Sequence, residues 1–369
     1  MENRNKLKYA VIGAGCGGQA IAGYLASENF DVTLYNRSIG RIEPLIETKV
    51  IRLKGALKGG GGLSYIGTDL CKALEDRDII MVVTTADGHK DIAGKMAPYL
   101  KNGQMIILNP GRTFGALEVD RAIREKGFCG NIIVAEANTL VYATRVRTPG
   151  TAVIKGVKKE VSIAALRAGH TSSVLSKIRS AFSQFTAARS ILETSFGNIG
   201  AVFHPVIILF NRDRIRAGKP FDFYIDGVTK KIAATIEKVD NEMRQVAQAL
   251  GAVPLSVTEW LASRYDLPGT DIHSMIKSNP TYQGIESPAT LDHRYLWEDI
   301  PTGLVPVSSF GKALNIKTEM IDYLIDLGSE LLGRDFRDQG RTVGTLGLSK
   351  QGLREELENI IFPRKIEAA

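Results

Sequence analysis

Three glycines near the amino terminus have the spacing of a phosphate-binding turn. Gly13, Gly15 and Gly18 form a GxGxxG pattern between the apolar residues 8–12 and the amphipathic residues 19–27. In this context the first glycine allows a tight turn, the second lets the backbone approach a pyrophosphate, and the third lets a helix pack closely on a strand. The N–H groups that open the helix then face the phosphates. An ordinary glycine turn is the alternative, but the position between a strand and a helix favours a dinucleotide site.

The residues after the second predicted strand, Asn36, Arg37 and Ser38, bear on which nicotinamide cofactor is bound. An acid at this point would bind the ribose 2′-hydroxyl of NAD, whereas an arginine accepts the 2′-phosphate of NADP. There is no carboxylate here, and Arg37 offers a charged fork between two neutral partners. The sequence therefore favours NADP(H). NAD(H) is the alternative, because an arginine also stacks on adenine without requiring the phosphate. A further alternative is that Arg37 is a solvated turn residue.

Five histidines are the candidates for proton transfer near neutral pH. His89 follows a predicted strand, at the sheet edge where ligands of α/β proteins bind, so it is either a cofactor-side residue or the cap of the next helix. His204 stands at the entry of an apolar helix, where a core histidine is the simpler interpretation. The remaining three are interpreted as surface residues: His170, His273 and His293.

A second polar segment, residues 292–306, is poor core material. It crowds an arginine, several acids and aromatic residues into a stretch that ends in prolines and glycine.

At these residues the chain resembles the octopine/nopaline (opine) dehydrogenase family, over nearly its whole length. Beyond the glycine pattern the resemblance is carried by Asn109-Pro110-Gly111 with Glu118, by Asn198 to Pro205 with Asn211, and by Arg294-Tyr295 with Glu298-Asp299-Ile300-Pro301 and Gly303-Leu304. Enzymes of this family join the amino group of an amino acid to a 2-oxo acid and reduce the resulting imine with a nicotinamide cofactor. The resemblance thus implies amino-acid and 2-oxo-acid substrates.

The resemblance also implies roles for four residues. His204 would be the acid/base, and Asp299 would orient and polarise its imidazole, as in other His–Asp pairs. Arg294 would hold a substrate carboxylate through two parallel hydrogen bonds, with a structural ion pair as its alternative role. Asn198 would hold the histidine loop or a polar group of the substrate. No metal site is implied.

The elements that must position these residues predict an α/β fold. A Rossmann-type doubly wound parallel sheet, residues 1–187, is followed by an all-α second domain, residues 188–369. Short apolar strands are expected at residues 8–12, 32–35, 79–84, 105–108 and 132–135. The glycines 59–62 are expected to form a loop between two short strands, and residues 144–163 an antiparallel extension of the sheet edge.

The second half of the chain has helical periodicity. In residues 228–250 apolar side chains recur every three or four positions. Further helices are expected at residues 205–211, 257–265, 318–332 and 350–360.

Composition bounds the remaining properties. Over 369 residues, 44% are hydrophobic and 24% charged, which is typical of a globular protein. The three cysteines form neither a disulfide framework nor a CxxC metal site, so a cytoplasmic location is expected. The net charge of +7 is scattered, so the expected ligands are small anions and not nucleic acid. No membrane association is expected, and a homodimer is expected by analogy with this architecture.

Two alternatives remain open. One is an enzyme like the ketopantoate reductases and 3-hydroxyacid dehydrogenases, which share the two-domain layout but use a lysine of the helical domain. Lys230 and Lys231 are the local lysines, without a supporting Asn or Glu arrangement. The other alternative is a non-catalytic NADP(H)-binding sensor, for which the segments around His204 and Asp299 would be merely structural.

Overall fold

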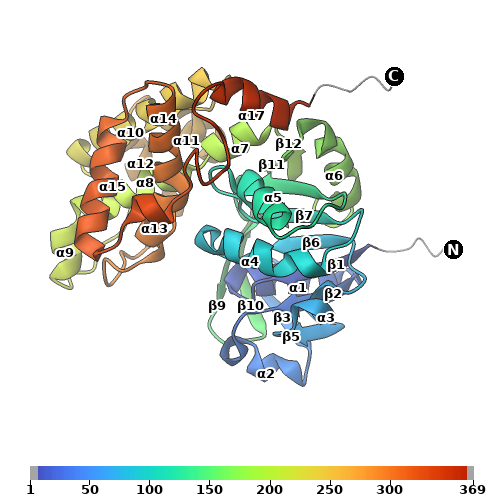
Figure 1. The fold of residues 1–369 in the computed structure, drawn as a ribbon. Coiled ribbons are helices and arrows are strands. Elements are labelled where there is room, and N and C mark those ends of the chain that lie inside the picture. Colours follow the sequence, from blue (N-terminus) through green and yellow to red (C-terminus); the bar gives the residue numbers. More distant parts are fainter. Residues whose placement is uncertain (1–6, 364–369) are drawn as a thin grey trace. The chain divides into compact units, whose positions relative to one another are not determined.

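The computed structural model describes residues 7–363 of the protein. The chain divides into two compact units (Figure 1). The first runs to Thr194 and takes in the chain again from Glu358; the second comprises Ser195–Leu357. The predicted boundary lies between residues 187 and 188, with the whole carboxy-terminal part in the second domain. The division falls later because residues after 187 still bind the first unit. Ala188 N–H donates to Ile163 O at 2.9 Å, and the Thr194 hydroxyl donates to the Glu136 carboxylate at 2.7 Å.

The first unit is built on an eight-stranded sheet, which confirms the predicted α/β class. In spatial order its strands are β12 (Phe185–Ala187), β11 (Val161–Ala165), β8 (Ile133–Ala137), β7 (Met105–Leu108), β6 (Ile79–Val82), β1 (Lys8–Ile12), β2 (Asp31–Tyr35) and β5 (Tyr65–Gly67). Neighbouring strands are parallel except for the antiparallel pair β8 and β11. The central strands β6 and β7 are apolar and buried at every position, as expected where helices cover both faces.

Helices of the first unit lie between the strands in sequence. They are α1 (Cys16–Ser27), α2 (Glu43–Ile46), α3 (Leu70–Leu74), α4 (His89–Met96), α5 (Gly115–Glu125) and α6 (Thr171–Ile178). Short 3-10 turns precede or follow several of them: η1 (Ile39–Arg41), η2 (Ala86–Gly88), η3 (Ala97–Tyr99) and η4 (Ala168–His170).

A second, four-stranded sheet replaces two predicted features. Its order is β4 (Gly59–Gly62), β3 (Val50–Gly55), β10 (Thr151–Val157) and β9 (Tyr142–Val146). The prediction of a loop at the four glycines was wrong, because they form strand β4. Their lack of side chains lets β4 lie against α1, since a Cβ at Gly61 would lie 2.7 Å from Ala26 O. Residues 144–163 were also misplaced in part, because β9 and β10 belong to this sheet and only β11 joins the main one.

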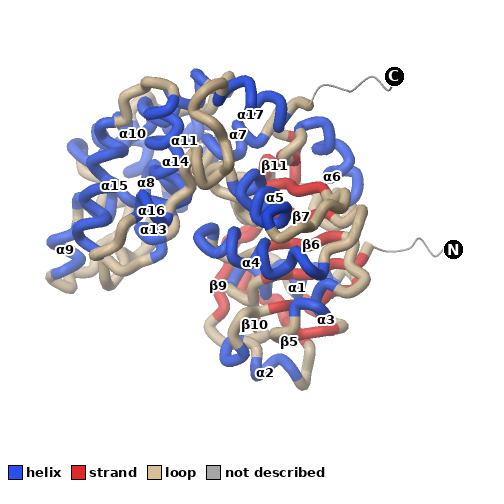
Figure 2. Tube along the Cα trace, viewed as in Figure 1, coloured by secondary structure: helices blue, strands red, loops and turns tan. Residues whose placement is uncertain are grey.

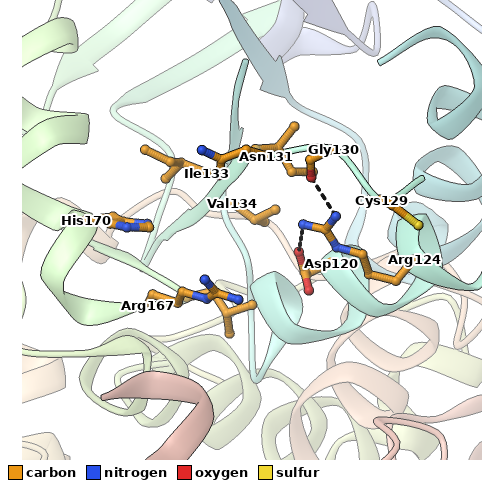
Figure 3. Close-up of a pocket in the computed structure, with 11 residues that line it drawn as sticks. Asp120, Arg124, Cys129, Gly130, Asn131, Ile133, Val134, Arg167 and His170 are labelled. Atoms are coloured by element: carbon orange, nitrogen blue, oxygen red, sulfur yellow. Dashed lines mark hydrogen bonds and ion pairs between the residues drawn. The ribbon is translucent and has the colours of Figure 1, made fainter. Parts of the chain in front are cut away.

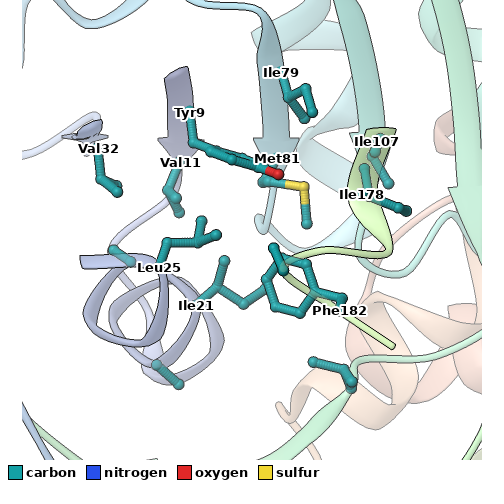
Figure 4. Packing of buried hydrophobic residues seen from close by; sticks show 14 of the residues in the cluster. Tyr9, Val11, Ile21, Leu25, Val32, Ile79, Met81, Ile107, Ile178 and Phe182 are labelled. Carbon is teal, nitrogen blue, oxygen red and sulfur yellow. The ribbon is translucent and has the colours of Figure 1, made fainter. Parts of the chain in front are cut away.

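Helix α1 packs on strands of both sheets. It is buried along most of its length and rich in small residues, which allow the second sheet to approach closely. Figure 4 shows Ile21 and Leu25 of this helix among the side chains of the main core, near Val11 and Phe182. The glycine pattern that begins α1 is thus held by the best-buried helix of the unit.

The second unit is helical, and Figure 2 shows no strand in the described part of it. Its helices are α8 (Ile199–Phe210), α9 (Arg212–Arg216), α10 (Lys230–Ala249), α11 (Val257–Tyr265), α12 (Ile272–Ser278), α13 (Arg294–Trp297), α14 (Val305–Ala313), α15 (Glu319–Leu332) and α16 (Phe336–Gln339). A 3-10 turn, η5 (Pro280–Tyr282), and one π-helical turn, η6 (Ile300–Leu304), complete it. Two helices cross the unit boundary: α7 (Ile191–Phe196) and α17 (Leu353–Ile361).

Helix α8 is the core helix of this unit. It is apolar on all sides and packs against α10, α13, α15 and η6. It begins six residues before the predicted start and contains Pro205 in its interior. Together α7 and α8 form a stretch, Ile191–Phe210, long and apolar enough to cross a membrane. However, 78% of its apolar window is buried inside the structure, as a core helix requires.

Candidate functional site

The glycine turn between β1 and α1 has the geometry of a phosphate cradle. Gly13 donates its N–H to Tyr35 O at 2.8 Å and adopts φ +107°, a conformation that L side chains rarely adopt. A Cβ at Gly18 would lie 1.7 Å from Gly13 O, so no other residue fits there. Gly15 is the N-cap of α1 and has no side chain to cap it. The N–H groups of the first turn are therefore left to an anion.

The predicted ribose-side residues have two different roles in the structure. Asn36 braces the turn, because its Oδ1 accepts the Ala14 N–H at 3.0 Å and its Nδ2 donates to Ser38 O at 2.9 Å. Arg37 and Ser38 are exposed at the end of β2. Asn36 thus shapes the loop together with Ser38, whose Oγ also accepts from Asn36 Nδ2 at 3.3 Å, while Arg37 is available to a ligand.

Sequence reasoning missed Arg41 as a second basic residue at this turn. It ends η1, and its Nη1 lies 3.7 Å from where a Cβ of Gly15 would stand. The guanidinium therefore lies over the glycine turn. Its position four residues after Arg37 was the available signal, but only the fold of η1 brings it back to Gly15.

His89 is the first residue of α4, and its side chain is fully buried. The predicted capping role does not occur, because Gly88 is the N-cap and no side chain caps this helix. The imidazole is buried at the start of α4, and a role of His89 on the cofactor side stays a prediction.

His204 lies at the centre of the second unit's polar site. Its Nδ1 is 2.6 Å from the Asp299 carboxylate, and its Nε2 is 3.2 Å from the Tyr224 hydroxyl. Its ring stacks on Tyr295 with centroids 3.8 Å apart and planes at 14°. Asp299 is fully buried. The tautomer that satisfies both partners has Nδ1–H donating to Asp299 and Nε2 accepting from Tyr224.

Close packing of two backbone segments brings Asp299 to His204. Asp299 immediately precedes the π-helical turn η6, a rare structure that is frequent at functional sites. Gly303 within this turn lies against the start of α8, because an added Cβ would meet Ala201 Cβ at 2.5 Å and Asn198 Nδ2 at 3.2 Å. Asn198 is buried at the N-cap position of α8. It therefore lies where it can hold the segment that carries His204.

Arg294 lies five residues before Asp299, at the start of α13. Its side chain is 49% exposed and approaches the Glu298 carboxylate at 3.8 Å, too far for a hydrogen bond. The guanidinium also lies 5.5 Å from the centroid of the Tyr295 ring. This ion pair is weak, which leaves the donor fork of Arg294 to a ligand.

His293 was predicted as a solvated surface residue, and the structure corrects this. It is partly buried, caps α13 by accepting the Tyr295 N–H at 3.4 Å, and packs edge-on against the Tyr295 ring. Burial lowers its pKa first, and the charges of Arg294 and His204 lower it further.

A cluster of aromatic side chains around His204 was not anticipated. Tyr224 stacks on Tyr282 with centroids 4.2 Å apart, and Tyr265 meets Tyr282 edge-on at 5.4 Å. Burial raises the pKa of Tyr224 well above its usual value, and the neighbouring Tyr295, Tyr265 and Asp299 raise it further. The aromatic run Phe221-Asp222-Phe223-Tyr224 was a signal in the sequence, but its spacing does not reveal which ring meets the histidine.

A polar hollow of about 280 Å³ lies elsewhere, in the first unit (Figure 3). Its walls include Asp120 and Arg124 of α5, Ile133 at the start of β8, and Arg167 and His170 after β11. Because β11 runs antiparallel to β8, these residues lie at the amino-terminal edge of the parallel strands. Ligands of such sheets bind at the opposite edge, so the hollow is separate from the glycine turn. Among residues 7–363 no group of three or more His, Cys, Asp and Glu side chains is placed to hold a metal.

Comparison with known proteins places both units. Residues 187–332 match the family model of the NAD/NADP octopine/nopaline dehydrogenase alpha-helical domain, and residues 8–127 match the NAD binding domain of 6-phosphogluconate dehydrogenase. An opine dehydrogenase of Arthrobacter sp. (strain 1C) is 37% identical over 354 residues, 95% of this chain and 98% of the relative.

Solved structures agree on the fold. An octopine dehydrogenase with NADH and L-arginine matches with a TM-score of 0.80 at 20% identity, covering 99% of this chain and 100% of that one. A yersinopine dehydrogenase with bound NADP+ matches with a TM-score of 0.75 at 16% identity, covering 96% and 99%.

Proposed function

This chain belongs to the opine dehydrogenase family, NAD(P)-dependent oxidoreductases acting on CH–NH bonds, and from that premise we propose that it joins an amino acid to a 2-oxo acid by NADPH-dependent reduction of an imine. The product would be an N-(carboxyalkyl)amino acid, and the reverse oxidation would follow the same path. The observation that carries the proposal is the contact of His204 with the buried Asp299 at 2.6 Å.

This pair suits a reaction that moves protons at a carbon bearing both nitrogen and oxygen. The amino group must lose a proton before it attacks the 2-oxo acid, and the resulting carbinolamine must lose water. A carboxylate that accepts from Nδ1–H stabilises the imidazolium and fixes its orientation, so that one imidazole serves as base and then as acid. Bound NADPH supplies the hydride that reduces the imine.

Arg294 is the proposed anchor for a substrate carboxylate. It is half exposed, has a long contact to Glu298 and a cation–π contact with the Tyr295 ring, and lies five residues before Asp299. A planar fork of donors matches a carboxylate and orients it. Asn198 is proposed to hold the start of α8, and so to keep His204 in place.

Two arginines support the preference for NADPH. Solved relatives carry either cofactor, since the octopine dehydrogenase holds NADH and the yersinopine dehydrogenase holds NADP+. Here no carboxylate follows β2 at positions 36–38, and the exposed Arg37 and Ser38 are close in sequence to Arg41 over the glycine turn. Positive charge at this point favours a 2′-phosphate over a 2′-hydroxyl. The glycine turn itself fits the pyrophosphate of either cofactor.

A coupled assay tests the function directly. NADPH oxidation is followed with pyruvate, an oxo acid bound in a solved octopine dehydrogenase, with and without a panel of amino acids. Oxidation that requires both substrates, with a secondary amine identified by mass spectrometry, is the expected result. Oxidation with the oxo acid alone would favour a hydroxyacid dehydrogenase. Tight cofactor binding without turnover under any pairing would favour a sensor.

A further inference from the structure

Both ring nitrogens of His204 already have partners in the structure. Asp299 takes Nδ1 and the Tyr224 hydroxyl takes Nε2, while the Tyr295 ring covers one face of the imidazole. A proton can enter or leave the imidazole only through its nitrogens. Every proton that His204 exchanges therefore passes by way of Asp299 or Tyr224, unless one of these contacts breaks.

A proton cannot reach a substrate by way of Asp299. The side chain of Asp299 is fully buried, so it has no surface that a substrate could contact. Tyr224 retains 9% of its surface, and His204 retains 13% of its side-chain surface. Of the two partners of His204, Tyr224 alone retains exposed surface, which makes it the candidate for contact with a substrate oxygen or nitrogen.

The segment that carries Tyr224 is braced against movement. The Phe223 N–H donates to Ile285 O at 2.6 Å, and the Asp222 carboxylate accepts the N–H groups of Ile225 at 3.1 Å and Gly284 at 2.7 Å. The ring itself is stacked on Tyr282. Swinging the hydroxyl away from His204 would break this packing, so the contact at Nε2 favours passage through Tyr224 over its displacement.

Resting on the proposed function, we infer that Tyr224 is a further catalytic residue, whose hydroxyl carries protons between Nε2 of His204 and the reacting atoms of the substrate. First the substrate ammonium gives a proton to Oη while Oη–H passes its own to Nε2, which yields the free amine and an imidazolium. The amine then adds to the oxo carbon, and a proton moves from nitrogen to oxygen to give the neutral carbinolamine.

The second transfer runs in the opposite direction. The C–O bond of the carbinolamine breaks, the nitrogen lone pair forms the C=N bond, and the leaving hydroxyl takes the Oη proton while Nε2–H replaces it. Water and a protonated imine result, the imidazole is neutral again, and total charge is conserved. Because the pKa of Tyr224 is held far above neutrality, the phenol gives and receives its protons together and does not persist as a phenolate.

A double-mutant cycle tests the relay. Tyr224→Phe keeps the ring and its stacking but removes Oη, and Tyr282→Phe is the matched control, because it removes a buried hydroxyl one ring further from His204. We expect kcat to fall about 100-fold in Tyr224→Phe and by less than about threefold in Tyr282→Phe, with unchanged NADPH affinity in both. In a His204→Ala background, Tyr224→Phe should cost less than about threefold more, since both residues act in one chain.

Two results would overturn the relay. One is a kcat of Tyr224→Phe within threefold of wild type or above it, which would make Oη a mere cap on Nε2. The other is an additive loss in the double variant, which a purely structural role predicts. The ¹⁵N resonance of Nε2 supplies a readout without turnover: it should shift in Tyr224→Phe and stay in place in Tyr282→Phe, and an unshifted resonance contradicts the contact. The proposed function is judged on wild-type substrate requirements alone, so the two ideas fail separately.

Discussion

The glycine turn of the first unit and the His204 centre of the second are held in place in opposite ways. The turn uses six consecutive residues, and its shape comes mainly from backbone sterics: the positive φ of Gly13 and the 1.7 Å approach that excludes a side chain at Gly18, with Asn36 as the one side-chain brace described above. The His204 centre uses side chains from separate helices, with His204 and Asp299 95 positions apart. A site whose shape is set by the backbone can be predicted from local sequence, whereas a site made of side chains depends on how helices pack.

The largest effect should come from the centre built of side chains. His204→Ala removes the proposed acid/base, and we expect turnover to fall about 10²- to 10⁴-fold. The dissociation constant for NADPH, measured by fluorescence titration, should change less than about twofold because the glycine turn belongs to the other unit. Near-normal turnover would end the acid/base assignment.

Asp299→Asn is the companion variant. It keeps the shape of the side chain but removes the charge that stabilises an imidazolium, so turnover should again fall by at least about tenfold. The circular dichroism spectrum of each variant should match wild type. If the spectrum of either variant departs from it, the loss would be one of folding and not of proton transfer.

The turn built of backbone should respond to a single methyl group. Gly18→Ala places a Cβ where Gly13 O stands, so the loop must move, and we expect NADPH affinity to fall about tenfold or more. Gly40→Ala is the matched control, because nothing lies within 4 Å of an added Cβ there. Isothermal titration of NADPH would decide it, and equal affinities in the two variants would contradict the close-packing argument.

Arg37 tests whether side chains add selectivity to a backbone site. Arg37→Ala should raise the KM for NADPH about tenfold and leave that for NADH within about twofold, since a hydrogen bond between charged groups contributes about 1.5–3 kcal/mol. Arg52→Ala is the control, because it removes an exposed arginine of strand β3 in the same unit. A preference of wild type for NADH, unchanged by the substitution, would refute the NADP assignment.

Asp240 of α10 is a buried carboxylate that the proposed mechanism does not use. Comparing it with Asp299 tests whether burial alone makes a carboxylate functional. Burial raises its pKa to about 6, and its Oδ2 accepts the Val257 N–H at 3.2 Å, at the start of α11. The folded state therefore binds a proton more tightly than the unfolded one, so this group makes the protein less stable as pH rises from about 4 to 6. Between pH 4.5 and 7 it should lower the unfolding free energy by about 2 kcal/mol.

Asp240→Asn should remove that part of the pH dependence in urea titrations at the two pH values. Turnover should stay at the wild-type level, in contrast with Asp299→Asn. A stability profile parallel to wild type would show that Asp240 does not titrate as described.

Several elements could be predicted because their cause is local. Strands β1 and β7 match the predicted residues, and α10 and α15 lie within one or two residues of the expected helices, since periodic burial sets them. Strand β4 could not be predicted, because four glycines show no alternation of apolar and polar side chains and their pairing with β3 depends on space beside α1. The start of α8 was missed because Pro205 suggested a first turn where the structure has a helix interior.

The sequence by itself determined the glycine turn, the α/β class and, through resemblance, the family and the pairing of His204 with Asp299. Tertiary structure alone decided that Tyr224 meets Nε2, that Arg41 returns to Gly15, and that Gly303 lets η6 pack on the start of α8. The physical reason is the distance along the chain over which each interaction acts. Backbone conformation and amphipathic periodicity act within a few residues, whereas a contact between side chains 20 or 95 positions apart exists only after helices have packed.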